Sequence, residues 1–453
     1  MDYQTFLETK RHSIGDFGFE PNYYPDIAFD FQKYGIEKAI RKGRIGLFFD
    51  TGLGKTLIQL AIANNIIRHT NKRVLILTPL AVAFQFIIEA EKLGIDDIEY
   101  SKDGKFTKKI VLCNYERLHY FNSSDFVCVV LDESSILKNF DGKIKSQINA
   151  FIKKVPYRFL STATPSPNDY IEFGTSSEAL GYLPYMDMLS RFFANNENNI
   201  RPQDIGSKWY LKPHAKNDFF NWVNQWSITA KKPSDLGFSD DKYELPKLIE
   251  NTHFVRNRKN WVINGQIQMF NSIAKTMSEV REEQKGSIQE RCEKAIELAI
   301  GKTSVYWVNF NDEGELLSNI DNKAVEIKGG MQLEKKEEIL LAFARGEIER
   351  LITKPKITSF GLNWQHCNHS VFFPTWSYEQ YYQAIRRFWR FGQKREVTID
   401  RVLSDGQKRV LDALEYKTNK AIEFNSLIRK NLTKNIEIDY KEFSQPITKP
   451  KFI

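Results

Sequence analysis

The sequence has few of the features that mark secreted, membrane-spanning or metal-rich proteins. It holds only four cysteines in 453 residues, and these lie far apart without a CxxC pair. Such spacing favours neither a disulfide framework nor a zinc ribbon. No apolar run approaches the length that a bilayer-spanning helix needs, and the N-terminus lacks a signal-peptide layout. These absences together predict a cytoplasmic location.

Internal repeats, low-complexity tracts and a large charge excess are also missing from the sequence. The formal net charge is +8, with 42% hydrophobic and 27% charged residues, which is ordinary for a globular protein. The modest positive excess permits a polyanionic partner without establishing one. The length predicts two or three domains, each large enough to bury its own core.

Strand-like apolar runs alternate with amphipathic helical stretches along most of the chain, the pattern of parallel α/β sheets. The first five runs are RIGLFFD, RVLILTP, KIVLCNY, FVCVVLDE and YRFLSTATP. The later five are SVYWVNF, AVEIKGG, RLITKP, HSVFFPT and VTIDRVL. Two sets of five, separated by a different kind of sequence, predict an α/β protein with two parallel-sheet lobes.

The separating sequence predicts the remaining domain organisation. Residues 175–245 are rich in aromatic residues and lysine and look mainly helical, so we interpret them as an insert on a first lobe. The expected segments are an N-terminal lobe (1–174), this insert, a connector (246–290), a C-terminal lobe (291–404) and a terminal helix with tail (405–453).

Two interpretations of the insert remain open. Its aromatic side chains suit base stacking, but Phe219, Trp222 and Trp226 recur at helical spacing, which favours the core of a small helical unit. Its lysines would then remain available for a phosphate backbone. The expected nucleic-acid contacts in the insert are Lys208, Lys212 and Lys216.

The strongest local motif is DTGLGKT, Asp50 to Thr56, between a strand-like run and a helical run. In this order, glycines let backbone N–H groups wrap phosphates, and the helix N-terminus adds its positive end. Lys55 would reach the β and γ phosphates of ATP, and Thr56 would bind Mg²⁺. Phe49 replaces the first glycine of the general pattern. The expected nucleotide contacts are Thr51, Gly52, Gly54, Lys55 and Thr56.

A pair of carboxylates follows another strand-like run, in VVLDESS. Hydrolysis of ATP needs one carboxylate for Mg²⁺ and another for the attacking water. We expect Asp132 to hold the metal and Glu133 to polarise the water. A dipeptide of this kind is common in surface turns, so its weight comes from the phosphate loop upstream.

Further motifs make the pattern specific. They are FDFQKYG, TPLAV, DESSILKN, STATPSPN, GLNWQ and QAIRRFWRFGQ. With the phosphate loop, they resemble superfamily two helicases and, within these, the Swi/Snf-type translocase branch. KPSDLGF and FGLNWQHC look like the compact bacteriophage and prophage members, for which the location would be the host cytoplasm.

This resemblance implies two RecA-like lobes that hold ATP and Mg²⁺ and act on nucleic acid. Gln32 matches the glutamine that reads adenine, while Thr78 and Pro79 lie in a motif that contacts a DNA strand. Asn114 and Tyr115 are further expected strand contacts. The residues expected to couple hydrolysis to movement are Ser161, Thr162, Thr164, Asn168, Gly361 and Asn363.

The arginine-rich motif also has a geometric reading. Gln383, Arg387 and Arg390 fall at i, i+4 and i+7, so a continuous helix carries all three on one face. Such a face would offer two guanidinium groups to ATP held by the other lobe, and Gln383 is a further expected nucleotide contact. An arginine finger of this kind is worth about 10³–10⁵ in rate.

The leading function is therefore a DNA-dependent ATPase that acts as a helicase or duplex translocase. An RNA-dependent ATPase is a second reading, because lobes of this kind serve either polymer. A third is a motor subunit or binding module whose effector is a separate protein. Stand-alone unwinding of a fork would favour the first reading, and activity that needs a partner would favour the last.

Overall fold

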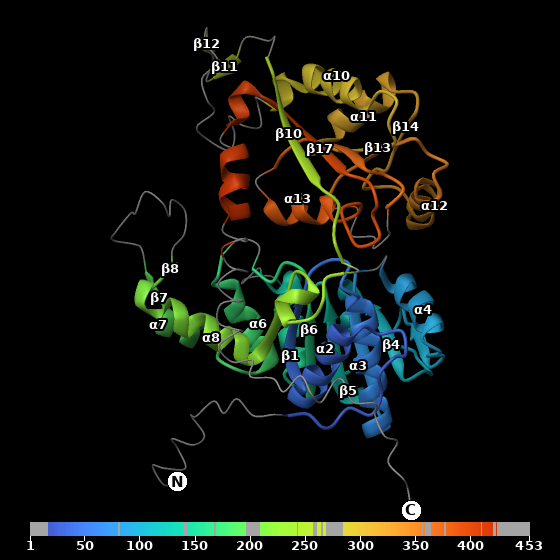
Figure 1. Ribbon diagram of the computed structural model, residues 1–453, viewed down its shortest axis with the longest axis vertical. Coiled ribbons are helices and arrows are strands. Elements are labelled where there is room, and N and C mark those ends of the chain that lie inside the picture. Colours follow the sequence, from blue (N-terminus) through green and yellow to red (C-terminus); the bar gives the residue numbers. More distant parts are fainter. Residues whose placement is uncertain are drawn as a thin grey trace, which may run out of the picture. The chain divides into compact units, whose positions relative to one another are not determined.

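The ten predicted strands form two separate parallel sheets in the computed structural model of the chain (Figure 1). The chain folds into two compact units, whose main segments are Met1–Thr78 with Phe86–Asp240 and Asp241–Ala421. Each unit holds one of the two parallel sheets, which confirms two RecA-like lobes. The structure describes residues 17–79, 82–138, 143–166, 169–195, 209–241, 243–256, 261–263, 266–268, 284–355, 357, 364–375, 377–408, 410–419 and 423.

The first sheet has, within the described residues, seven parallel strands in the order β3-β4-β2-β5-β6-β1-β9. The five predicted strands are confirmed as β1, β2, β4, β5 and β6, and their apolar side chains are buried. The strands are β1 (Arg44–Phe49), β2 (Arg73–Thr78), β3 (Ile98–Tyr100), β4 (Ile110–Asn114), β5 (Phe126–Asp132), β6 (Tyr157–Ser161) and β9 (Ser227–Ala230).

Successive residues of a strand point to opposite faces of this sheet, and helices cover both faces. Phe48 packs against Phe173 and Trp226, with ring centroids 5.9 and 6.1 Å apart. Phe49 faces the other side, where its ring approaches Gly35. The helices are α2 (Asp30–Lys42), α3 (Lys55–Thr70), α4 (Ala83–Lys92), α5 (Lys143–Ile152), α6 (Glu172–Leu180), α7 (Tyr185–Phe192) and α8 (Lys216–Trp226).

Strand β9 comes from the segment predicted as an insert. It pairs in parallel with β1, and the N–H of Asp50 donates to the carbonyl of Ala230 at 2.9 Å. The segment therefore contributes the edge strand beside the phosphate loop. Its four residues, SITA, are too short a run to show a clear period. In the same segment β7 (Phe193–Asn195) and β8 (Trp209–Leu211) form an antiparallel pair.

The aromatic side chains of the insert are core residues. Phe219 and Trp226 are fully buried, and Trp222 is partly buried against them. Phe219 also contacts Phe192 and Phe193 at centroid distances of 5.5 and 5.4 Å. The rings are therefore packing residues, as predicted, but they belong to the core of the first lobe rather than to a separate small helical unit.

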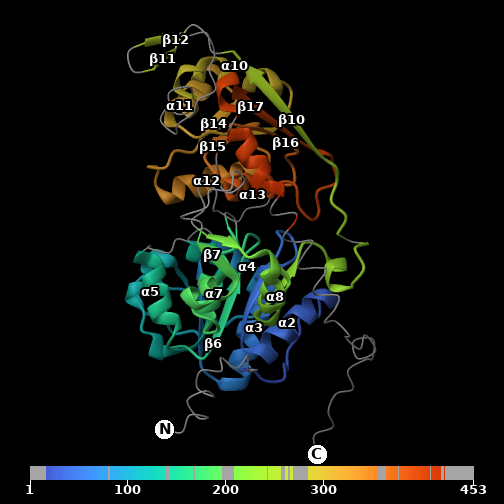
Figure 2. The ribbon, with the colours of Figure 1, turned by 90° about the vertical axis from the view of Figure 1, so that its left-hand side faces the viewer.

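The second sheet has six parallel strands in the described part of the chain, ordered β10-β17-β16-β13-β15-β14. The five predicted strands are confirmed, and β10, from the predicted connector, adds an edge strand (Figure 2). The strands are β10 (Leu248–Val255), β13 (Ser304–Trp307), β14 (Ala324–Glu326), β15 (Arg350–Thr353), β16 (His369–Phe372) and β17 (Val397–Ser404). A short antiparallel pair joins β11 (Trp261–Ile263) and β12 (Gln266–Gln268).

The helices that pack on this second sheet include α10 (Ile288–Ala299), α11 (Asn311–Ile320), α12 (Leu333–Ala344) and α13 (Tyr378–Ile385) (Figures 1 and 2). Residues 410–419 are helical as well, and Leu414 lies in the core of the same lobe. No helix that the structure describes, in either unit, combines the length and apolarity needed to cross a membrane.

Candidate active site

The phosphate loop joins the end of β1 to the start of α3, as the sequence predicts. Gly52 and Gly54 have φ angles of 94° and 77°, a region that residues with a Cβ rarely adopt. A Cβ on Gly54 would also overlap the amide of Gln32. Lys55 Nζ donates to the carbonyls of Phe49 (3.1 Å) and Asp50 (3.4 Å). The lysine thus lies along the loop, at the first residue of α3.

Gln32 connects α2 to this loop. Its side chain is buried, its Nε2 donates to the carbonyl of Leu53 at 3.1 Å, and its Oε1 accepts the N–H of Phe29 at 2.9 Å. The structure therefore brings Gln32 next to the predicted phosphate-binding residues. Thr51 and Thr56 lie on the same loop and the first turn of α3 and are half-buried.

Asp132 ends β5 with its carboxylate buried. Gln59 Nε2 donates to Oδ1 at 2.8 Å, and the Thr78 hydroxyl donates to Oδ2 at 3.1 Å. Burial and the neighbouring Glu133 raise the pKa of Asp132 to about 6, while Gln59, Lys55 and Thr78 act in the opposite direction. The carboxylate is thus held at both oxygens at the carboxyl edge of the sheet.

Glu133 has a left-handed backbone, with φ of 54°. A residue with a Cβ pays roughly 1–2 kcal/mol for this conformation, and such strain is concentrated at functional sites. The turn re-aims the chain directly after β5, and Thr162 Oγ1 donates to Glu133 Oε2 at 3.3 Å. Nothing in the sequence pattern indicates this backbone geometry.

Strand β6 lies between β5 and β1, so the STATP motif at its end lies beside both the carboxylates and the loop. Ser161 Oγ accepts from Gln59 Nε2 at 3.1 Å. The N–H of Thr162 donates to the Leu47 carbonyl at 3.3 Å, and its hydroxyl accepts the N–H of Thr164 at 3.1 Å. Three of the predicted coupling residues are therefore assembled with the predicted catalytic carboxylates.

In the second lobe the arginine-rich motif does not form the single helical face that its spacing predicts. Helix α13 ends at Ile385, and the chain continues in turns. The carbonyl of Arg387 accepts the N–H of Trp364 at 3.1 Å, and that of Phe388 accepts Gln393 Nε2 at 3.3 Å. In a longer helix these two carbonyls would accept backbone N–H groups four residues further along the chain. Gln383 alone of the three predicted residues lies within α13.

The arginines are nevertheless close to one another. Burial, followed by the charges of Arg387 and Arg386, lowers the pKa of Arg390 to about 10. Arg390 Nε is buried and has no hydrogen-bond partner among the residues that the structure describes. The Arg390 side chain as a whole is half-buried, and this unpaired Nε–H can donate to an anionic ligand.

Comparison with known protein families agrees with this geometry. Residues 29–173 match the DEAD/DEAH box helicase model, and residues 288–392 match the helicase conserved C-terminal domain. The chain is a helicase-type ATPase. No curated protein sequence matches it. A solved structure described as the Sulfolobus solfataricus SWI2/SNF2 ATPase core in complex with dsDNA is similar at 19% identity and a TM-score of 0.42, over 94% of this chain and 98% of that one.

The residues of this helicase-type ATPase that were predicted to contact a nucleic-acid strand lie beside the carboxylates or inside the first lobe. The Thr78 hydroxyl is occupied by Asp132, and Pro79 follows it directly. Asn114 is buried, donates to Glu116 Oε2 at 2.7 Å and accepts from the Tyr100 hydroxyl at 3.0 Å. Tyr115 is also buried, and its hydroxyl donates to the Asp132 carbonyl. Thr78 and Tyr115 therefore hold Asp132 from within the lobe, whereas Asn114 bonds to its own neighbours. Contact of these side chains with nucleic acid stays a prediction.

Two of the predicted lysines also have protein partners. Lys212 Nζ donates to the carbonyls of Ser190 (2.9 Å) and Arg191 (3.2 Å) in the last turn of α7. Lys216 Nζ pairs with Glu423 Oε1 at 2.7 Å, and both side chains are exposed. Predicted residues that lie outside the described part of the chain are Lys208, Asn168, Gly361 and Asn363.

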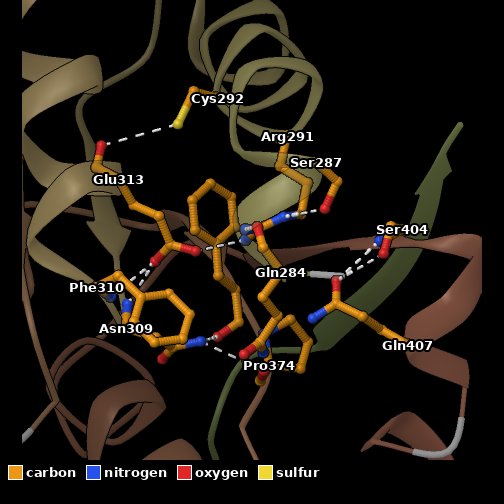
Figure 3. Close-up of polar contacts among 11 residues, drawn as sticks. Gln284, Ser287, Arg291, Cys292, Asn309, Phe310, Glu313, Pro374, Ser404 and Gln407 are labelled. Carbon is orange, nitrogen blue, oxygen red and sulfur yellow. Dashed lines mark hydrogen bonds and ion pairs between the residues drawn. The ribbon is translucent and has the colours of Figure 1, made fainter. Parts of the chain in front are cut away.

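A buried polar cluster at the carboxyl edge of the second sheet escaped the sequence reasoning (Figure 3). Arg291 and Glu313 are fully buried and form an ion pair of 2.6 Å. Glu313 Oε2 also accepts the N–H groups of Asn309 (2.7 Å) and Phe310 (3.0 Å). Asn309 Nδ2 donates to the Phe373 carbonyl at 3.0 Å. The cluster fixes the loops after β13 and β16, and the acidic residue in the first turn of α11 was its only sequence signal.

Proposed function

We propose that this chain is a DNA-dependent ATPase that acts as a DNA helicase or duplex translocase. The observation that carries this proposal is the junction at the end of β6. There, residues of the STATP motif touch the predicted water-positioning carboxylate directly and the predicted metal carboxylate through Gln59. Because the carboxylates and the STATP motif share hydrogen bonds, a change in the nucleotide at the carboxylates can change the preferred conformation of the motif.

The residues at the loop fit ATP with Mg²⁺. Asp132 is a buried carboxylate whose oxygens accept from the neutral donors Gln59 and Thr78, and Mg²⁺ prefers such oxygen ligands. At the N-terminus of α3, a Cβ on Gly54 would overlap the Gln32 amide, so only glycine lets the loop approach this glutamine so closely. When bound, Mg²⁺ would neutralise phosphate charge, with Asp132 and Thr56 as its protein ligands.

Each remaining residue has a distinct role in this proposal. Lys55 and the loop amides bind the phosphates, and Gln32 contacts the adenine. Glu133 orients the attacking water and accepts its proton, for which the left-handed turn aims its carboxylate. Arg387 and Arg390 supply positive charge to the transferring phosphoryl group. Thr162 and Ser161 then change conformation when nucleotide binding or hydrolysis alters the two carboxylates.

Preference for DNA rests on the sequence motifs. TPLAV, DESSILKN, GLNWQ and QAIRRFWRFGQ resemble the Swi/Snf-type translocases rather than RNA helicases. The net charge of +8 suits a polyanion of either kind. Backbone recognition implies that binding weakens steeply with salt and depends little on base sequence.

The test is ATP turnover measured side by side with single-stranded DNA, duplex DNA, forks, four-way junctions and RNA. We expect DNA to stimulate turnover well above RNA, and Glu133→Gln to remove the stimulated rate while nucleotide binding persists. Equal or greater stimulation by RNA would overturn the DNA assignment. Stimulation that appears only with an added cellular protein would favour a motor subunit that needs a separate effector.

A further inference from the structure

Gln59 is a fully buried glutamine on α3, one helical turn after Lys55. Its Nε2 donates to Asp132 Oδ1 at 2.8 Å and to Ser161 Oγ at 3.1 Å. The three residues come from the phosphate-loop helix and from the ends of two neighbouring strands. No motif in the sequence draws attention to this glutamine, because it follows the GKT letters inside an apolar helical run.

The two hydrogen bonds fix the orientation of the Gln59 amide. Both go to its nitrogen, while Oε1 is buried without a hydrogen-bond partner among the described residues. A flipped amide would bring its carbonyl oxygen against the Asp132 carboxylate, where two acceptors repel each other. The donor therefore has one arrangement, and it faces the carboxylate.

Asp132 is held symmetrically as a result. Gln59 donates to Oδ1 and Thr78 donates to Oδ2, so neither carboxylate oxygen can rotate away without losing a bond. Mg²⁺ demands near-ideal octahedral geometry and accepts little displacement of its ligands. Outer partners that orient a metal ligand typically change metal affinity or activity by about 10–100-fold when removed.

We infer that Gln59 is a positioning residue that orients Asp132 toward the nucleotide-bound magnesium and links this carboxylate to Ser161. The inference rests on the proposed ATPase function and adds to it a residue that no motif assigns. It separates two effects: Gln59 acts on the metal-dependent part of nucleotide binding and on turnover, and leaves metal-independent binding to the loop.

The first experiment replaces Gln59 by Met, which keeps an unbranched side chain of similar length and removes the donor. Binding of the fluorescent analogue mant-ATP is measured over a Mg²⁺ titration, with Glu133→Gln present in both proteins to prevent hydrolysis. We expect binding without Mg²⁺ to stay within about twofold. The Mg²⁺ concentration for half-maximal tightening should rise about tenfold or more, and kcat without the Glu133 change should fall about 10–100-fold.

A matched control comes from the same helix. Asn65 is also a fully buried amide on α3, but it bonds to backbone groups of Asn22, Tyr23 and Ala61 and to no part of the nucleotide site. Asn65→Met should therefore lower the melting temperature without changing the Mg²⁺ dependence. If it shifts the Mg²⁺ dependence as much as Gln59→Met does, damage to α3 explains both variants and the inference fails.

A double-mutant cycle tests the link to Ser161. Ser161→Ala removes the second partner of Gln59, and its effect on kcat should be largely contained in that of Gln59→Met, so the double variant loses little more. Fully additive losses would overturn the link. Should Gln59→Met fail to fold, Gln59→Leu is measured instead, because it also removes the donor to Asp132 without placing a charge beside it.

The outcomes separate this inference from the proposed function. Failure of the proposed function is an unmodified protein that binds mant-ATP but never hydrolyses ATP with any nucleic acid. Failure of the inference is normal turnover in the unmodified protein together with an unchanged Mg²⁺ dependence and kcat in Gln59→Met.

Discussion

The left-handed backbone of Glu133 allows function and stability to be separated at one position. With φ of 54°, the residue sits where glycine is favoured, yet the site needs a carboxylate there. We compare Glu133→Gly with Glu133→Ala. Both variants remove the carboxylate and its hydrogen bond from Thr162, which the structure gives as 3.3 Å. Their difference therefore isolates the backbone.

The magnitude follows from the conformation. A Cβ in the left-handed region costs roughly 1–2 kcal/mol. Glycine recovers this strain but loses more chain entropy on folding, which offsets about 0.5–1 kcal/mol. Glu133→Gly should therefore exceed Glu133→Ala in free energy of unfolding by about 1 kcal/mol. For a lobe of this size, that difference raises the melting temperature by about 2–4 °C.

The assay is thermal denaturation of both variants followed through the first-lobe transition, with ATP turnover measured on the same samples. Turnover should fall about 10²–10⁴-fold in both, because each lacks the general base. Glu133→Gln, which keeps the side-chain shape, should lose turnover and retain nucleotide binding. A melting temperature for Glu133→Gly at or below that of Glu133→Ala would refute the strain argument. Near-normal turnover of Glu133→Gln would refute the role of the carboxylate.

Three further predictions concern the other residues of the site and the insert. Lys55→Ala should abolish ATP turnover with an unchanged circular dichroism spectrum; residual turnover above a few per cent would contradict the phosphate role. Arg390→Ala, and likewise Arg387→Ala, should lower kcat about 10³–10⁵-fold while DNA affinity without ATP, measured by fluorescence anisotropy, stays the same; a selective loss of DNA affinity would make these arginines strand contacts. Lys216→Ala should weaken DNA binding and reduce the salt slope of binding by about one. Lys212→Ala should instead lower the melting temperature, because Lys212 donates to the end of α7. Unchanged DNA affinity of the Lys216 variant would make the insert a scaffold.

Local patterns in the sequence were sufficient for the framework of this protein. Buried parallel strands are continuous apolar runs, so each of the ten could be recognised without knowledge of its neighbours. The phosphate loop was equally visible, because its glycines, lysine and threonine are adjacent in sequence. Gly54 shows why: the positive φ of 77° and the close approach of Gln32 are demands on a single residue.

The prediction that depended on the length of a helix was wrong. The spacing of Gln383, Arg387 and Arg390 fits one helical face, but α13 ends at Ile385. Its end depends on partners at Trp364 and Gln393, which no local period reveals. The short strand β9 was not predicted, because its four residues show no clear period. Its strand conformation depends on pairing with β1.

The arrangement of groups around Asp132 was decided only by the tertiary structure. Gln59 and Ser161 are separated by 102 residues, and they meet because parallel strands bring their carboxyl ends to one edge with β6 between β5 and β1. Tyr115, directly after β4, reaches the same edge and donates to the backbone of Asp132. The sequence by itself determined which residue types bind phosphate and metal, because those demands are local. Which buried amide orients the metal carboxylate depends on strand order, and strand order is set by contacts between distant segments.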